Sequence, residues 1–317
     1  MAGKGASMAK AVKKQKAIKG EVELKAKNAG LSVSRKYTTP GVNPLDEVEY
    51  IKRDSLITNP DGSVVFRMEN AETPKGWSQL ATDILVHKYF RKRGVPKQAS
   101  EKSARQVVER IAETIREEGE KAGNYFSSNE DANAFEMELK HLLINQKGAF
   151  NSPVWFNCGL YHKYGITGSG GSWFWNAKTK EYELTKNSYE HPQCSACFIQ
   201  SINDDLMSIF ELAKTEAKLF KYGSGTGTNF SKIRSRFERL SGGGTSSGLM
   251  SFLEVLDRGA GATKSGGTTR RAAKMVCLDI DHPEIVDFIE WKVKEERKVA
   301  ALIEAGYSSV RRHIPIF

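Results

Sequence analysis

Glycine-rich loops alternate with short β-prone runs and well-capped helices after Phe150, and this alternation constrains the fold more than any other feature of the sequence. Repetition of strand and helix in this way is typical of an α/β fold. The runs predict strands at 197–201, 228–233 and 275–280. The helices between and after them are expected to open at Asp204 and Asp205, to run over 247–256, and to start at Asp281 with Pro283 in the first turn.

The region before Phe150 has a different pattern. A turn at 59–62 followed by the apolar run 63–68 predicts a hairpin. Apolar residues at helical spacing then predict three amphipathic helices, one over 77–91, one with Val108, Ile111 and Ile115 on its buried face, and one with Phe135, Leu139 and Leu142. The expected organisation is a disordered basic tail at 1–35, a mainly helical domain at 36–150 and an α/β region at 151–317.

The charge and the apolar content exclude several classes of protein. The formal net charge is +10, but eight lysines fall within the first 27 residues. Such a run is typical of a solvated tail, and a nucleic-acid contact is the alternative interpretation. No apolar run approaches the roughly 20 residues of a membrane helix, and the start of the chain lacks the apolar centre of a signal peptide. A cytoplasmic protein without membrane contact is therefore expected.

Two generic nucleotide-binding motifs fail on inspection. The glycines at 259–265 would form a phosphate-binding P-loop only with glycine before Lys264, where Thr263 stands. The same stretch misses the dinucleotide fingerprint, because Lys264 occupies its last glycine position. Neither a Walker ATPase nor a Rossmann dehydrogenase is supported.

The four cysteines, at 158, 194, 197 and 277, are too few for a disulfide scaffold and are interpreted as thiols. Cys194 and Cys197 form a CxxC pair that could bind zinc together with Cys158 and His162. If the pair lies on a strand, however, residues three apart point to opposite faces and cannot reach one ion. The strand prediction thus disfavours a metal site, and the alternative for each cysteine is a small buried apolar residue.

Four longer strings carry a family resemblance: NSPVWFNCG, QCSACFIQSINDDL, GSGTGTNFSKIRSR and SGGTTRRAAKMVCLDIDHPEIVDFI. On these strings the chain resembles the amino-terminal half of an adenosylcobalamin-dependent, class II ribonucleotide reductase, over roughly residues 37–307. The resemblance implies the first half of a ten-stranded α/β barrel preceded by a small helical domain. It also implies radical-based reduction of ribonucleoside diphosphates or triphosphates to deoxyribonucleotides for DNA synthesis, with adenosylcobalamin as cofactor.

The resemblance assigns a ribonucleotide substrate site. Cys197 matches a thiol that, with a partner thiol, donates two electrons as the ribose 2′-hydroxyl is lost, and a thioredoxin-type partner would reduce the resulting disulfide. Ser152 matches a substrate-binding hydroxyl, and Ala196 and Gly225 match positions that line the nucleotide. A glycine suits a backbone that a ligand approaches closely, because a Cβ atom would leave too little room.

The resemblance also implies a deoxynucleotide effector site at the interface of a homodimer. Asp204 matches an effector-binding acid and Arg234 an effector-phosphate arginine, although a helix cap and a solvated surface charge are the alternative roles. A loop that couples effector to substrate is matched by Lys264, Ser265, Gly266, Gly267, Arg270 and Arg271. Its glycines permit movement, and its arginines suit phosphate contacts.

The family's Asn-Pro-Cys-Gly-Glu loop, which bears the radical cysteine, does not occur in the sequence. The carboxy-terminal half and the partner of Cys197 are therefore expected to be missing, as in a gene fragment, a frameshift product or half of a split enzyme. The isolated chain is expected to be inactive. A non-catalytic nucleotide-binding regulator and a basic, zinc-stabilised nucleic-acid-binding protein are the alternatives.

Overall fold

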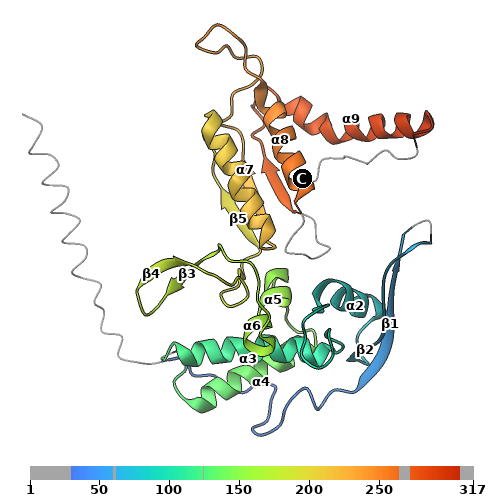
Figure 1. The fold of residues 1–317 in the computed structure, drawn as a ribbon, viewed down its shortest axis with the longest axis vertical. Helices are drawn as coiled ribbons and strands as arrows, with labels where there is room; N and C mark the ends of the chain where they lie inside the picture. The colour runs from blue at the N-terminus through green and yellow to red at the C-terminus, as the bar shows by residue number, and fades with distance from the viewer. Residues whose placement is uncertain (1–29, 60–61, 124, 264–271, 308–317) are drawn as a thin grey trace, which may run out of the picture.

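The computed structural model describes residues 30–59, 62–123, 125–263 and 272–307. Its helices and strands follow one another as β1 (Tyr50–Thr58), β2 (Val64–Pro74), α2 (Gln79–Ile84), the π-helix η1 (Leu85–Tyr89), α3 (Ala104–Lys121), α4 (Asn129–Ile144), α5 (Ser152–Asn157), α6 (Leu160–Tyr164), β3 (Trp173–Asn176), β4 (Glu181–Leu184), β5 (Cys197–Gln200), α7 (Leu206–Lys221), β6 (Gly225–Asn229), α8 (Gly248–Ala262), β7 (Lys274–Cys277) and α9 (Ile285–Glu304). Figure 1 shows a lower body built from the elements up to α6 and an upper body built from β5 onward.

The lower body consists of a long antiparallel hairpin and a helical layer. Strands β1 and β2 pair from Tyr50 opposite Pro74 to Thr58 opposite Val64, which confirms the predicted hairpin. Ser103 caps α3 in a capping box with Gln106, so both side chains satisfy backbone N–H groups at the helix start. These local signals and the apolar helix faces explain why the sequence forms this layer.

One hydrophobic core is shared by the hairpin and the helices of the lower body. It contains Val107, Val108 and Ile111 of α3 and extends to Trp155 and Cys158, beyond the predicted domain boundary at 150. Helix α5 thus packs on the amino-terminal core, although its sequence falls within the predicted α/β region. The division at 150 stays a prediction.

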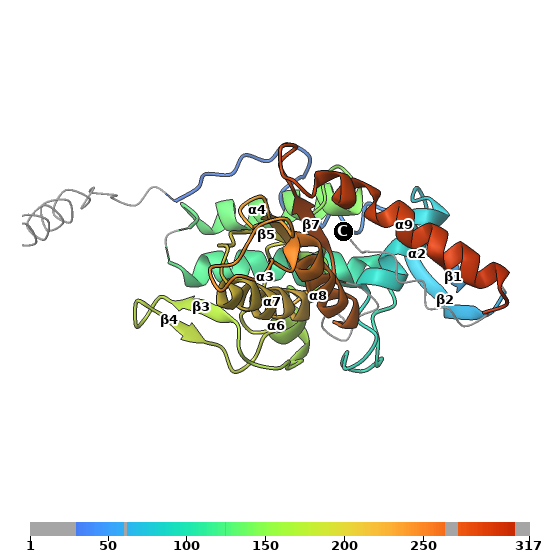
Figure 2. The ribbon, with the colours of Figure 1, turned by 90° about the horizontal axis from the view of Figure 1, so that it is seen from above.

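The upper body is a three-stranded parallel sheet in the order β5-β6-β7. Helices α7 and α8 cover one face, where Leu212, Leu249 and Leu253 are buried in a second core. Figures 1 and 2 show that α9 extends sideways from this sheet, and only Trp291 and Val299 of that helix are buried.

The predicted α/β class is confirmed, whereas the ten-stranded barrel is not seen in the described part of the chain, whose sheets are open and have two, two and three strands. The strand predicted at 228–233 is wrong in position, because β6 covers Gly225–Asn229 and the chain turns between Phe230 and Ile233. The strand predicted at 275–280 ends at Cys277, and the helix predicted at 247–256 continues to Ala262.

Residues 30–35, at the end of the predicted tail, make definite contacts. Leu31 donates its N–H to the Tyr125 carbonyl, and the Arg35 guanidinium lies 2.8 Å from the Glu130 carboxylate. The rest of the predicted tail lies outside the described residues. None of the described helices combines the length and the apolar character that crossing a bilayer requires.

Candidate functional site

Cys197, Ala196 and Gly225 lie together at the start of the parallel sheet. Cys197 is the first residue of β5 and is paired in register with Gly225, the first residue of β6. The Gly225 N–H donates to the Ala196 carbonyl over 2.6 Å. Cys197 is an exposed free thiol, so its sulfur is accessible to a ligand or a reductant.

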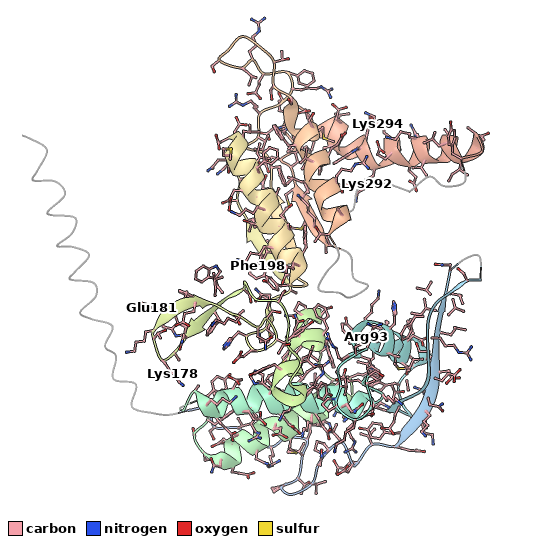
Figure 3. The ribbon with its side chains drawn as sticks, viewed as in Figure 1. Arg93, Lys178, Glu181, Phe198, Lys292 and Lys294 are labelled. Atoms are coloured by element: carbon pink, nitrogen blue, oxygen red, sulfur yellow. The ribbon has the colours of Figure 1, made fainter. Side chains whose placement is uncertain are left out.

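The sheet has one covered and one open face, and Cys197 belongs to the open one. Cys197 and Ile199 are exposed while Phe198 and Gln200 between them are half-buried. A Cβ atom on Gly227 would lie 3.1 Å from Met275 Cε and 3.3 Å from Ile199 Cδ1, which places those two side chains on the same open face. Figure 3 marks Phe198, the residue after Cys197, at the lower end of the upper body.

Packing within the sheet disfavours a side chain at position 225. A Cβ atom there would lie 3.0 Å from the Ala273 carbonyl oxygen of the segment leading into β7. The main chain of the neighbouring strand therefore restricts this position before any ligand is considered.

Ser152 lies on a helix that contacts the segment leading to Cys197. It is the first residue of α5, and its Oγ is 3.0 Å from the hydroxyl of Tyr89. At the other end of α5, the Asn157 amide donates to the Gln193 carbonyl over 3.2 Å and to the Tyr222 carbonyl over 3.5 Å. Figure 1 accordingly shows α5 below the end of the sheet at which β5 and β6 begin.

Asp204 and Arg234 are brought together as an ion pair. Arg234 Nε lies 2.5 Å from Asp204 Oδ2, and the Arg234 N–H donates to Asp204 Oδ1 over 3.2 Å. The cap of α7 is Asp205, which accepts from the Ser208 N–H, so Asp204 is not the capping residue. Both paired side chains are about one third exposed, at 30% and 37%. The predicted coupling loop, Lys264 to Arg271, lies outside the described residues.

Cys194 and Cys197 do not lie on one strand as expected, because Cys194 precedes the start of β5. Cys194 instead packs against the amino-terminal core that contains Cys158. The two thiols line a cavity of about 620 Å³ with His162 and His191. Burial raises the pKa of Cys158 to about 12 and also raises that of Cys194, so both stay protonated at neutral pH. Within the described ranges, no group of three or more His, Cys, Asp or Glu side chains could hold a metal ion.

Cys277 shares the open face with Cys197 but is too distant to be its dithiol partner. It pairs in register with Asn229, four positions beyond the Gly225 level and two strands across from β5. Strand geometry separates the two Cα atoms by about 13 Å along the strands and about 10 Å across them. A disulfide needs Cα atoms within about 7 Å.

Two buried ion pairs that the sequence does not predict support these elements. The Arg110 guanidinium lies 2.6 Å from Glu101 and donates to the carbonyls of Trp155 and Cys158, each over 2.6 Å, so it caps the end of α5. In the upper body, Lys274 Nζ lies 2.8 Å from Glu216 between the sheet and α7. Charged residues are rarely fully buried, and nothing in the sequence pattern marks these four as exceptions.

Two protein families match parts of this chain, and both are families of ribonucleotide reductases. The ribonucleotide reductase barrel domain family matches residues 195–308, which include Cys197, Gly225, Asp204 and Arg234. The family described as class II vitamin B12-dependent ribonucleotide reductase matches residues 51–146. A solved structure, the Actinobacillus ureae class Id ribonucleotide reductase alpha subunit, is similar with a TM-score of 0.39 and 18% identity over 63% of this chain and 28% of that one.

The curated relatives are vitamin B12-dependent ribonucleotide reductases. The vitamin B12-dependent ribonucleotide reductase of Agrobacterium fabrum is 49% identical over 90% of this chain and 25% of its own length. The corresponding protein of Rhodopirellula baltica is 46% identical over 90% of this chain and 28% of its own length. The chain belongs to the vitamin B12-dependent ribonucleotide reductase family and spans about a quarter of the length of these relatives, rather than the half that its motifs suggest.

Proposed function

We propose that the chain provides a reducing thiol and part of the nucleotide site of a ribonucleotide reductase. The observation that carries the proposal is the exposed Cys197 thiol at the start of β5, on the open face and in register with Gly225. Residues 36–150 would form the amino-terminal domain, and residues from 151 would begin the ten-stranded barrel with β5, β6 and β7. Residues 1–35 would form a basic tail.

The proposed chemistry removes the ribose 2′-hydroxyl as water. A thiyl radical on another part of the enzyme first abstracts the 3′-hydrogen. Cys197 and a partner thiol then supply two electrons and two protons and become a disulfide. The abstracted hydrogen returns to C3′, which regenerates the thiyl radical, and a thioredoxin-type dithiol reduces the disulfide. Ala196 and Gly225 would line the nucleotide, and Ser152 would bind it through its hydroxyl.

Adenosylcobalamin is the proposed cofactor of the complete enzyme, where it would generate the radical. The cavity of about 620 Å³ between α3 and the segment 173–194 does not fit it. Cavities of roughly 300–1,000 Å³ hold drug-sized molecules, and cobalamin is larger. This cavity is therefore not assigned to the cofactor.

The proposed allosteric site comprises Asp204, Arg234 and the 264–271 loop, which would bind a deoxynucleotide at a homodimer interface. The ion pair between Asp204 and Arg234 supports their assignment to one site. An effector phosphate would compete with the Asp204 carboxylate for the arginine. The guanidinium is accessible enough for that exchange, since its side chain is 37% exposed.

A reconstitution experiment tests the function. The chain is combined with a polypeptide that carries the remaining reductase sequence, including an Asn-Pro-Cys-Gly-Glu loop, and supplied with adenosylcobalamin, a dithiol and a ribonucleoside diphosphate. We expect deoxyribonucleotide formation that falls to background in Cys197→Ser, because the serine hydroxyl cannot form a disulfide. Cys277→Ser is the matched control and should retain activity.

Two results would contradict the proposal. Reduction that survives Cys197→Ser would remove the role of this thiol. Nucleotide binding by calorimetry without reduction in the combined polypeptides would favour a non-catalytic regulator.

A further inference from the structure

The hydroxyl of Tyr89 is the closest described polar partner of Ser152. Tyr89 is the last residue of η1, and its Oη lies 3.0 Å from Ser152 Oγ. Short π-helical segments often occur at functional sites. The resemblance assigns a role to Ser152 and none to Tyr89.

The packing around Tyr89 fixes this contact from two sides. The Tyr89 ring lies 6.0 Å from the Trp155 ring of α5, measured between centroids. Arg110 donates to the Tyr89 carbonyl over 3.5 Å and to the Trp155 carbonyl over 2.6 Å. One buried guanidinium therefore holds both the residue that carries the phenol and the helix that carries the serine.

The chemistry of the two hydroxyls gives the bond a direction. Either hydroxyl could donate, but a phenol is the stronger acid and therefore the stronger donor. If Tyr89 donates to Ser152 Oγ, the Ser152 O–H is left to donate to a ligand oxygen. Accepting a hydrogen bond also polarises the serine hydroxyl and strengthens it as a donor.

We propose that Tyr89 is a positioning residue for substrate binding, which orients the Ser152 hydroxyl so that its proton points to an oxygen of the nucleotide. The inference rests on the proposed function, since it needs Ser152 to contact substrate. It gives the amino-terminal domain a direct part in building the nucleotide site of the barrel.

Kinetics of the reconstituted enzyme test the inference. Tyr89→Phe keeps the ring contact with Trp155 and removes only the hydroxyl. Loss of one hydrogen bond should raise KM for a ribonucleoside diphosphate about 2- to 10-fold with kcat little changed. Tyr182→Phe, which alters an exposed tyrosine of β4, is the control and should leave KM unchanged.

A double-mutant cycle separates positioning from general packing. In the Ser152→Ala background, Tyr89→Phe should cause no further rise in KM, because Tyr89 acts only through the serine hydroxyl. In the Ser152→Thr background, which keeps a hydroxyl, Tyr89→Phe should again raise KM.

The outcomes distinguish the inference from the function beneath it. Additive effects of Tyr89→Phe and Ser152→Ala, or an unchanged KM in Tyr89→Phe, would overturn the role of Tyr89 while leaving the reductase proposal intact. A wild-type reconstituted enzyme that neither binds nor reduces nucleotides would overturn the proposed function and this inference with it.

Discussion

The buried Arg110–Glu101 pair of the lower body and the buried Lys274–Glu216 pair of the upper body differ in how many other groups depend on them. Arg110 and Glu101 also bind two carbonyls of α5, the Arg91 N–H and the Tyr164 hydroxyl. Beyond their own contact, the hydrogen bonds of Lys274 and Glu216 extend to the Thr226 hydroxyl. The first pair is therefore a junction between segments distant in sequence, whereas the second mainly neutralises charge under a sheet.

The two bodies differ in the same sense at their surfaces. The lower body closes a core around α3, and the upper body leaves Ile199 81% exposed and Met275 54% exposed on the open face of its sheet. A face that displays both apolar side chains and the proposed reducing thiol is suited to be covered by further barrel strands and by substrate. The difference indicates that the lower body holds its side chains in fixed positions, whereas the upper body exposes Cys197 and apolar side chains on the open face of its sheet.

Removal of Arg110 should have the largest effect on stability. Arg110→Leu leaves the Glu101 carboxylate buried without its cation and strips the end of α5 of its donor. We expect the free energy of unfolding of the lower body to fall by about 3–5 kcal/mol. Urea unfolding, with hydrogen exchange of α3 and α5 peptides to locate the loss, measures it.

The matched control is Lys121→Ala on the same helix. Its ion pair with Glu118 is exposed on both sides and should contribute less than about 1 kcal/mol. Equal losses in Arg110→Leu and Lys121→Ala would show that the buried junction has no special weight.

Replacing whole pairs with apolar residues sharpens the comparison and should give a smaller effect in the upper body. In Glu216→Leu/Lys274→Met, the Thr226 hydroxyl loses its acceptor and the buried Asp257 carboxylate loses its interaction with Lys274, while the desolvation cost of the two replaced charges disappears. We expect a change within about 2 kcal/mol, of either sign.

The corresponding replacement in the lower body, Glu101→Leu/Arg110→Met, leaves several buried polar groups without a hydrogen-bond partner. Each such group should lower the free energy of unfolding by about 1–3 kcal/mol. This replacement should therefore destabilise clearly more than the upper pair in the same urea titration. Similar losses in the two double variants would refute the distinction between junction and isolated pair.

The sequence predicts the helices of the lower body well because their information is local. Val108 and Ile111 recur at helical spacing, and Ser103 provides a cap at the right distance from Gln106. Strand β6 was placed wrongly because its sequence, GTGTN, has glycines that β-propensity disfavours. Contacts with neighbouring strands explain the glycines: the Ala273 carbonyl lies close to Gly225, and the side chains of Ile199 and Met275 fill the space beside Gly227.

The site shows the same division between local and distant information. The motifs point to Cys197 and Gly225 separately, but their pairing depends on a parallel register across 28 residues that no local pattern encodes. Tyr89 lies 63 residues from Ser152, in a segment predicted only as a helix. The contact between Tyr89 and Ser152 depends on tertiary packing, in which Arg110 joins η1 to α5.

The smallest effect concerns the thiol of the closed core and is absent at neutral pH. Burial raises the pKa of Cys158 to about 12, so the folded state keeps a proton that the unfolded state loses from about pH 8.5 upward. The unfolded state then binds fewer protons, and the free energy of unfolding falls as pH rises through this window. Cys158→Ala should reduce that slope between neutral pH and about pH 10, whereas Cys277→Ala, which removes an exposed thiol of the open face, should not. Urea titrations of the three proteins at several pH values measure the slopes, and an unchanged slope in Cys158→Ala would show that this thiol titrates alike in the folded and unfolded chain.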